Sequence, residues 1–150
     1  MQQLIWSLVL FVHILAAAFW VGGQLMLVVV VMPLLRRSAS PDVVRTMARS
    51  AGKRFATLTN FGMLPTLAAT GVLLAWHDGV RLNNLGDTAF GRVLMVKAVL
   101  VVIVFSLAGL HGMLARRFSP KGIRGLAIAT LALSVVILGL AAALAMLPNP

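Results

Sequence analysis

The side chains best suited to bind a metal ion or support redox chemistry are three histidines, each lying in or beside a long apolar stretch. They are His13, His77 and His111. Neutral imidazole is a common ligand of copper and of haem iron. Because a polar side chain inside a bilayer is costly, it usually has a functional partner. His13 is therefore the first candidate ligand, although a histidine that only hydrogen-bonds to a neighbouring helix fits the same pattern.

His13 shares its predicted helix face with two tryptophans. Trp6, His13 and Trp20 are spaced by seven residues, which places all three on one side of an α-helix. Gln24 continues this face, and small residues beside it leave room for a neighbouring helix or a flat ligand. Trp20 therefore joins His13 among the candidate cofactor-binding residues.

Helix depth decides which other residues could share a ligand with His13. One metal ion in the outer half of the molecule fits the sequence best. Its candidate ligands are His13, His77, Met95 and Met146. Imidazole and thioether without thiolate suit copper, above all Cu(I), while haem iron also accepts His or His/Met. His111 lies too far toward the inner end to share that ion, and His77 also fits an anchor at the membrane interface.

Lys97 lies inside the third apolar stretch. It is close enough to the outer surface for its ammonium group to reach out of the membrane. If it points inward it needs an anionic partner, because a central lysine costs about 2.5–3.5 kcal/mol. No Asp or Glu lies in any apolar stretch. The partner would then be a ligand carboxylate, a lipid phosphate or the carbonyls at a helix end.

Four polar residues of the second apolar stretch fall on one helical stripe. They are Thr59, Thr66, Thr70 and His77. Threonine hydroxyls can bond to the carbonyl four residues earlier in their own helix. The stripe is therefore explained equally well as the polar inner face of the bundle.

The composition predicts an integral membrane protein. Hydrophobic residues make up 61% of the 150 residues, charged residues only 11%, and the mean hydropathy is +1.02, where soluble domains have roughly 45–50% and about 25%. The absence of Cys excludes disulfides and thiolate metal sites. The net charge of +10 would suit a nucleic-acid-binding protein. We nevertheless expect no nucleic acid, because the basic residues cluster in short links, where anionic phospholipid is the predicted partner.

Four apolar stretches are long enough to cross a bilayer, which takes about 20 helical residues. They cover residues 4–35, 55–76, 90–115 and 123–147. All four are expected to be helices, since an open strand would leave its backbone groups unpaired in lipid. The sequence thus predicts an all-α polytopic membrane protein, an antiparallel four-transmembrane-helix bundle forming a single domain over residues 1–150.

The links between the stretches predict the orientation. The first and third links hold ten basic residues and the second holds two, so both termini are expected outside the cytoplasm, on the periplasmic side of a bacterial cytoplasmic (inner) membrane. The ten are Arg36, Arg37, Arg45, Arg49, Lys53, Arg54, Arg116, Arg117, Lys121 and Arg124. Residues 38–42 predict a turn, followed by a short basic helix on the membrane surface.

Several segments resemble CopD-type copper-resistance membrane domains. Residues 12–23 read VHILAAAFWVGG, and residues 86–97 read GDTAFGRVLMVK; with residues 53–55 and 70–71, the resemblance covers nearly the whole chain. The related HemJ-type protoporphyrinogen oxidases share the histidine of the first helix, and the lysine and later histidine of the third. This chain lacks their Trp-Phe-Ala-Gly-Leu-Phe-Tyr run and has Leu110 where they have Tyr before that histidine.

The resemblance implies copper or haem b as cofactor, and the sequence does not separate the two. It implies that His13 is the first metal or haem ligand, that Lys97 contacts a haem propionate or substrate, and that His111 is a further site residue. Three functions follow: a copper-binding or copper-passing membrane protein, a b-type haem redox protein (as an enzyme, a haem-dependent membrane oxidoreductase), or a non-catalytic partner subunit. A homo-oligomer and a monomer are both compatible with the sequence.

Overall fold

The computed structural model is built of helices joined by short turns and loops. It describes the backbone of residues 1–81, 85–114 and 120–147, and the side chains of these residues except 108–114 and 120–124. The helices are α1 (Gln2–Leu25), α2 (Met32–Ser38), α3 (Pro41–Leu58), α4 (Leu64–His77), α5 (Ala89–Leu114) and α6 (Pro120–Leu144), with π-helical segments η1 (Met26–Val31) and η2 (Thr59–Met63). The described residues contain no strand, which confirms the all-α prediction.

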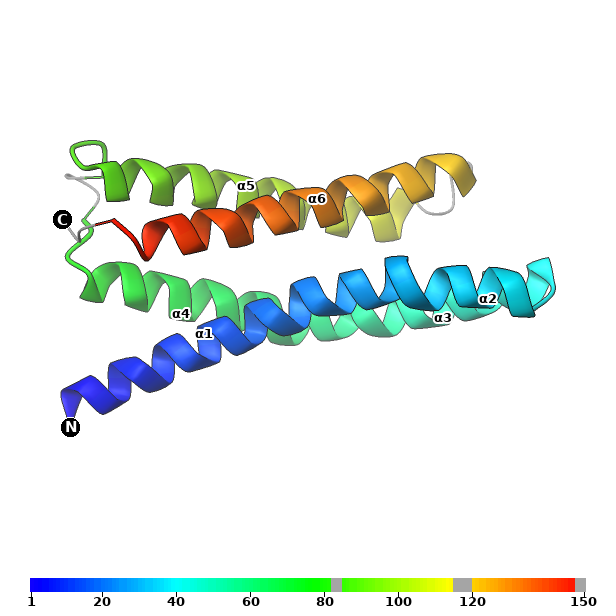
Figure 1. Ribbon diagram of the computed structural model, residues 1–150, viewed down its shortest axis with the longest axis horizontal. Coiled ribbons are helices and arrows are strands. Elements are labelled where there is room, and N and C mark those ends of the chain that lie inside the picture. The colour runs from blue at the N-terminus through cyan, green and yellow to red at the C-terminus, as the bar shows by residue number, and fades with distance from the viewer. Residues whose placement is uncertain (82–84, 115–119, 148–150) are drawn as a thin grey trace.

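Two long helices form the first hairpin (Figure 1). The first runs through α1, η1 and α2 over Gln2–Ser38, and the second through α3, η2 and α4 over Pro41–His77. Each has 37 residues, or about 55 Å at 1.5 Å per residue. That length exceeds the roughly 30 Å of a bilayer's hydrocarbon core. The α2–α3 end extends beyond the second hairpin (Figure 1).

The two π-helical segments are explained by prolines. Pro33 and Pro65 stand in the first turns of α2 and α4. A proline inside a helix removes one hydrogen bond and its ring collides with the carbonyl four residues earlier. Those carbonyls belong to Val29 and Phe61, which lie inside η1 and η2. The wider π turn therefore lets each helix continue through its proline without a break.

The predicted turn at residues 38–42 is present, but the basic segment after it differs from the prediction. Ala39 and Ser40 are extended, and Pro41 begins α3 with Asp42 in its first turn. We predicted a separate surface helix here. The structure instead continues the basic helix α3 past residue 55, where the apolar stretch begins, to Leu58 and through η2 into α4, so the basic and apolar segments form one helix.

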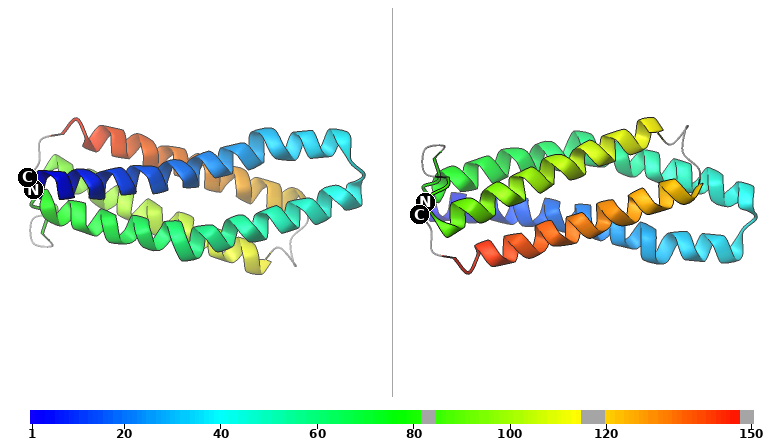
Figure 2. Two further views of the ribbon diagram at one scale, coloured as in Figure 1. Left: turned by 90° about the horizontal axis from the view of Figure 1, so that it is seen from below. Right: turned by 90° about the horizontal axis from the view of Figure 1, so that it is seen from above.

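The chain pairs as two antiparallel hairpins, α1 with α4 and α5 with α6 (Figure 1). Residues near both chain ends lie at the same end of the bundle as the α4–α5 loop (Figure 2). Leu144, at the end of α6, packs there against Val80 and Phe90. Which side of a membrane this end faces remains a prediction.

The interior is small and most large apolar side chains face outward. A central cluster contains Trp20, Val21, Val104 and Ile137. By contrast, Phe19 is 61% exposed and Phe61 is 83% exposed. Four helical segments, Gln2–Ser38, Pro41–His77, Ala89–Leu107 and Gly125–Leu144, are long and apolar enough to cross a membrane. The outward apolar surface therefore identifies a multi-pass membrane protein whose outer solvent is lipid.

Candidate functional site

A cavity of about 1360 Å³ lies between the two hairpins. Its walls come from α1, α4, α5 and α6, and most lining side chains are apolar. The central cluster contributes Trp20 and Ile137, and the cluster beside the α4–α5 loop contributes Phe90 and Leu144. The lining residues that carry an ionisable or hydroxyl group are His13, Asp78, Arg81, Lys97 and Ser134.

His13 lines this cavity from α1 and is held by a hydrogen bond to α4. Its Nδ1 lies 2.7 Å from Oγ1 of Thr70. The Thr70 hydroxyl donates its hydrogen to the Thr66 carbonyl oxygen at 2.6 Å. Because a hydroxyl has a single hydrogen, Thr70 must accept the hydrogen bond from His13, and Nδ1 carries the proton. Nε2 of the neutral ring then keeps its lone pair.

The helix surface beneath the His13 ring is shaped by a threonine and a glycine. Metal-binding histidines commonly donate their second ring N–H to an oxygen, which sets the tautomer and the ring orientation. Thr70 supplies that oxygen and is only 8% exposed. A Cβ at neighbouring Gly71 would lie 3.4 Å from Cε1 of His13, so the ring edge rests directly against this glycine.

The predicted inward face of α1 is confirmed at each of its positions. Trp6 stacks on His77 of α4, His13 contacts Thr70, and Trp20 is 4% exposed. The Trp20 ring meets the Phe105 ring of α5 edge-on, with centroids 5.6 Å apart. Trp20 therefore both lines the cavity and joins the two hairpins.

Gln24 lies one turn beyond Trp20 and is also buried. Its Nε2 donates to Oγ of Ser134 on α6 at 3.3 Å. Ser134 is fully buried and donates in turn to the Thr130 carbonyl oxygen at 2.8 Å. This polar pair links α1 to α6 and stabilises the packing between the hairpins at the level of the central cluster.

Lys97 and Met95 line the same cavity from α5. Lys97 is half-buried and carries the only ammonium group among the described residues of the cavity lining. Within the part of the chain that the structure describes, its ammonium group has no hydrogen-bond or ion-pair partner. Of the predicted site residues, His13, Trp20, Met95 and Lys97 therefore line one cavity, and Met95 is also 42% exposed at the outside of the bundle.

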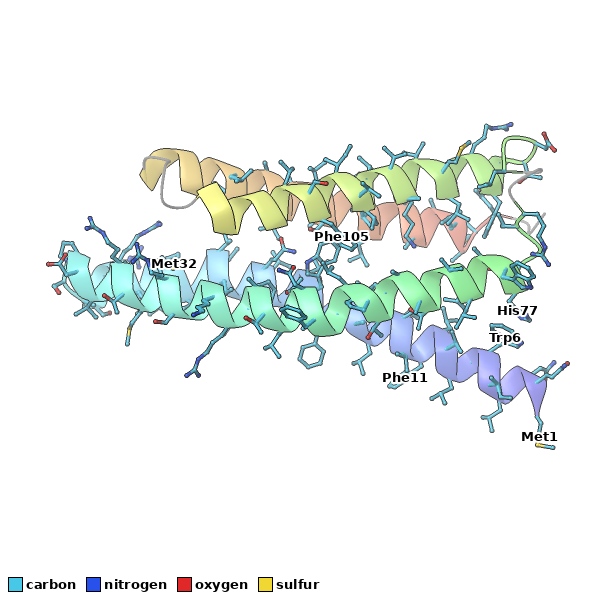
Figure 3. All side chains as sticks on the ribbon, turned by 180° about the vertical axis from the view of Figure 1, so that it is seen from behind. Met1, Trp6, Phe11, Met32, His77 and Phe105 are labelled. Carbon is cyan, nitrogen blue, oxygen red and sulfur yellow. The ribbon has the colours of Figure 1, made fainter. Side chains whose placement is uncertain are left out.

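The remaining predicted site residues lie elsewhere. His77 is exposed and stacks on Trp6, with ring centroids 4.1 Å apart and 13° between the planes (Figure 3). It is two turns along α4 from Thr70, or about 10 Å from the level of His13. Met146 is 86% exposed beyond the end of α6. The side chain of His111 lies outside the described residues.

The described part of the chain contains no conventional cluster of metal ligands. Across the described residues, no group of three or more His, Cys, Asp or Glu side chains is placed to hold an ion. A metal ion in this cavity would instead rely on the imidazole of His13 and a thioether such as that of Met95. Such a soft ligand pair favours Cu(I) over harder cations.

The loop between α4 and α5 closes one end of the cavity. Thr88 accepts a hydrogen bond from the Gly91 N–H at 3.0 Å, and Arg92 donates to the Gly86 carbonyl oxygen at 3.1 Å. Gly91 touches the backbone of Leu85 so closely that a Cβ would overlap its carbonyl oxygen. Residues 86–92, part of the segment that resembles the copper-resistance domains, therefore build the end of this loop and the first turn of α5.

Arg81 secures the other side of the loop. Its guanidinium lies 4.3 Å from the centre of the Trp76 ring and donates to the carbonyl oxygens of Trp76 and Val80, each at 2.8 Å. Asp78 and Arg81 line the cavity at this end. The charged side chains of the cavity are thus gathered toward the loop, and its apolar wall extends away from them to the central cluster.

Fold and site together define a small polytopic helical membrane protein with a histidine-containing cavity between two hairpins. The chain is 31% identical over 142 residues, 93% of its length, to a Bacillus subtilis (strain 168) protein named copper transport protein CutJ. It spans only 25% of that relative's length. It is also 39% identical over 67 residues, 45% of the chain and 46% of the relative, to an uncharacterized protein of Aquifex aeolicus (strain VF5).

The comparisons support a copper-related membrane protein and go no further. No protein-family model matches the chain, and no solved structure matches it. The resemblance to CopD-type domains therefore stays a prediction within that broader class. Neither relative's name mentions haem, so the haem alternative gains no support from them.

Proposed function

We propose that this chain is a membrane copper-binding protein that holds or passes Cu(I) in the cavity, with Nε2 of His13 as the first ligand. The observation that carries the proposal is the hydrogen bond from His13 Nδ1 to Thr70, which leaves the Nε2 lone pair available at the cavity. Met95 is the second candidate ligand, because its thioether lines the same cavity. The relation to a copper transport protein supports copper as the metal.

Copper binding can be tested by chelator competition. Purified protein in detergent is loaded with Cu(I) under anaerobic conditions and titrated with a coloured Cu(I) chelator. His13→Ala should lower the Cu(I) affinity at least tenfold, since a ligand bond is lost. His77→Ala is the matched control, because it removes an imidazole that does not line the cavity, and it should bind like the wild type. Equal affinity in His13→Ala and the wild type would contradict the proposal.

The haem alternative is tested in the same preparation. Protein expressed with an adequate haem supply is examined by visible absorption alongside elemental analysis. The copper proposal expects copper that is lost in His13→Ala and no Soret band. A Soret band at one haem per chain, lost in His13→Ala, would instead assign the histidine to haem. A second polypeptide without metal or haem would favour the partner-subunit function.

Reconstitution of the protein in vesicles distinguishes the binding of copper from its passage across the membrane. Wild-type protein and His13→Ala are placed in vesicles that enclose a Cu(I) indicator. Passage predicts copper entry that the wild type supports and His13→Ala does not. Entry equal to that of protein-free vesicles, combined with intact His13-dependent binding, would assign the chain to holding copper.

A further inference from the structure

The cavity is far larger than a copper site requires. A metal ion and its ligands are separated by only about 2 Å, whereas this cavity has a volume of about 1360 Å³. Typical sites for small organic molecules have roughly 300–1,000 Å³. The volume and the apolar lining therefore call for an occupant that contains a long hydrocarbon portion.

The cavity also opens sideways, through the surface that faces lipid. Seven large apolar residues of its lining are exposed at the outside of the bundle as well. They are Leu10 (46% exposed), Ile14 (56%), Val72 (68%), Trp76 (64%), Met95 (42%), Val102 (64%) and Leu138 (47%). In a bilayer these side chains border acyl chains, so a lipid chain could enter without crossing water.

The charge in the cavity selects an anionic occupant. Lys97 is half-buried on the cavity wall, and an ammonium group in such surroundings needs an anionic partner. Asp78 is the only acidic residue among the described residues of the lining, and it already takes part in another interaction. Lys97 lies eight residues into α5, about 12 Å from the start of that helix, within reach of a headgroup located beneath the loop.

We propose that the cavity binds one anionic phospholipid, with the phosphate on the Lys97 ammonium group and an acyl chain along the apolar wall. Arg81, which lines the cavity at the α4–α5 loop, adds positive charge at the headgroup end. The bound phosphate also neutralises the ammonium charge of Lys97, which lines the same cavity as His13. The lipid site itself does not depend on copper, and its test uses copper-free protein.

Trp20 can report an acyl chain in the cavity, because it lines the cavity and is buried from the outer lipid. The chain has three tryptophans, so the double substitution Trp6→Phe, Trp76→Phe leaves Trp20 as the only emitter. This protein, in neutral detergent, is titrated with phosphatidylglycerol or phosphatidylcholine carrying brominated acyl chains, which quench tryptophan fluorescence on contact. Saturable quenching is expected at about tenfold lower phosphatidylglycerol concentration, the effect of one charge-assisted hydrogen bond.

The lysine is tested by substitution in the same background. Lys97→Met should abolish the preference for phosphatidylglycerol, and Lys97→Arg should retain it. Arg49→Gln is the matched control, because it removes the same charge from an exposed position on α3 and should change nothing. Glycerol phosphate, the headgroup without chains, should not displace the lipid.

Three results would overturn the proposal. The first is equal quenching by the two lipids in the protein that has Trp20 as its only tryptophan and keeps Lys97. The second is an unchanged preference in Lys97→Met. The third is displacement by glycerol phosphate, which would mean that the site takes a free phosphate. Because chelator competition at His13 measures copper separately, failure here leaves the copper proposal to its own test.

Discussion

At the scale of single residues, Thr70 determines which nitrogen of His13 carries the proton and which keeps its lone pair. Thr70→Val keeps the shape of the side chain and removes the oxygen that accepts from Nδ1. The ring then loses its preferred tautomer and orientation, and Cu(I) affinity should fall about 10–100-fold, as is typical when the partner of a metal-bound histidine is removed. Chelator competition measures the change.

Two neighbouring substitutions control for the loss of a hydroxyl. Thr70→Ser keeps the acceptor oxygen and should bind copper like the wild type. Thr66→Val removes a hydroxyl that donates to the Gly62 carbonyl oxygen but keeps the Thr66 carbonyl that receives the Thr70 hydrogen. It should also retain affinity. Wild-type affinity in Thr70→Val would show that the tautomer is set in some other way.

Gly91 is a second position where a single added atom should change the stability of the protein. In Gly91→Ala the new Cβ would overlap the backbone carbonyl of Leu85, which cannot swing aside as a side chain can. We expect a loss of about 1–3 kcal/mol in unfolding free energy, the usual cost of overpacking, seen as a lower thermal midpoint in detergent. Gly22→Ala, where the Cβ meets nothing, should leave the midpoint equal or slightly higher.

At the scale of elements, the pairing of α1 with α4 holds His13 in position at the cavity. The Trp6–His77 stack and the His13–Thr70 bond fall at the same spacing along both helices. A double-mutant cycle of Trp6→Ala and His77→Ala should give a coupling free energy of about 0.5–1.5 kcal/mol, typical of aromatic pairs, in thermal or denaturant unfolding. Trp6→Ala with Trp76→Ala is the matched cycle and should be additive, because Trp76 packs under Arg81 instead.

The sequence predicted which residues of α1 share one face, but not which residues of α4 they contact. The seven-residue spacing of Trp6, His13 and Trp20 was sufficient to predict the inward face of α1, because no proline interrupts those residues. The threonine stripe of α4 did not show which threonine meets His13. That contact depends on the turn after Ser38 and on the π turns near Pro33 and Pro65, whose wider winding shifts the register of each helix.

The continuous helix from Pro41 to His77 was predicted as two pieces, a basic surface helix and a crossing helix that begins near residue 55. The basic residues of α3 fit an amphipathic surface helix, and the composition changes from basic to apolar where the second piece was placed. In the structure the α-helical backbone continues across that change to Leu58, and a π-helical segment then leads into α4. Composition therefore indicates where a helix can enter lipid, but not where the helix itself begins.

At the scale of the whole molecule, hydropathy predicted four membrane-crossing helices but not the space between the hairpins. Length and apolar content suffice for the crossings. The cavity lies between two sets of contacts. At one level, the Trp20–Phe105 pair and the Gln24–Ser134 pair hold the hairpins together. At the other end, Phe90 and Leu144 pack against each other and Val80. Such spacing is a property of contacts between distant residues, so Lys97 and His13 could not be placed on one cavity from sequence.

The shared location of both chain ends makes the orientation testable with fusions. Residues near both ends lie beside the α4–α5 loop, opposite the α2–α3 turn (Figure 2), and the six basic residues of the first link are all exposed on α2 and α3. Because basic links stay in the cytoplasm, alkaline phosphatase fused after residue 147 should be active in bacterial cells. The same enzyme fused at residue 40 should be inactive, and a fluorescent protein that folds only in the cytoplasm should give the opposite pattern. Active phosphatase at residue 40 would reverse the orientation and place the loop end of the cavity, with Lys97 and His13, on the cytoplasmic side.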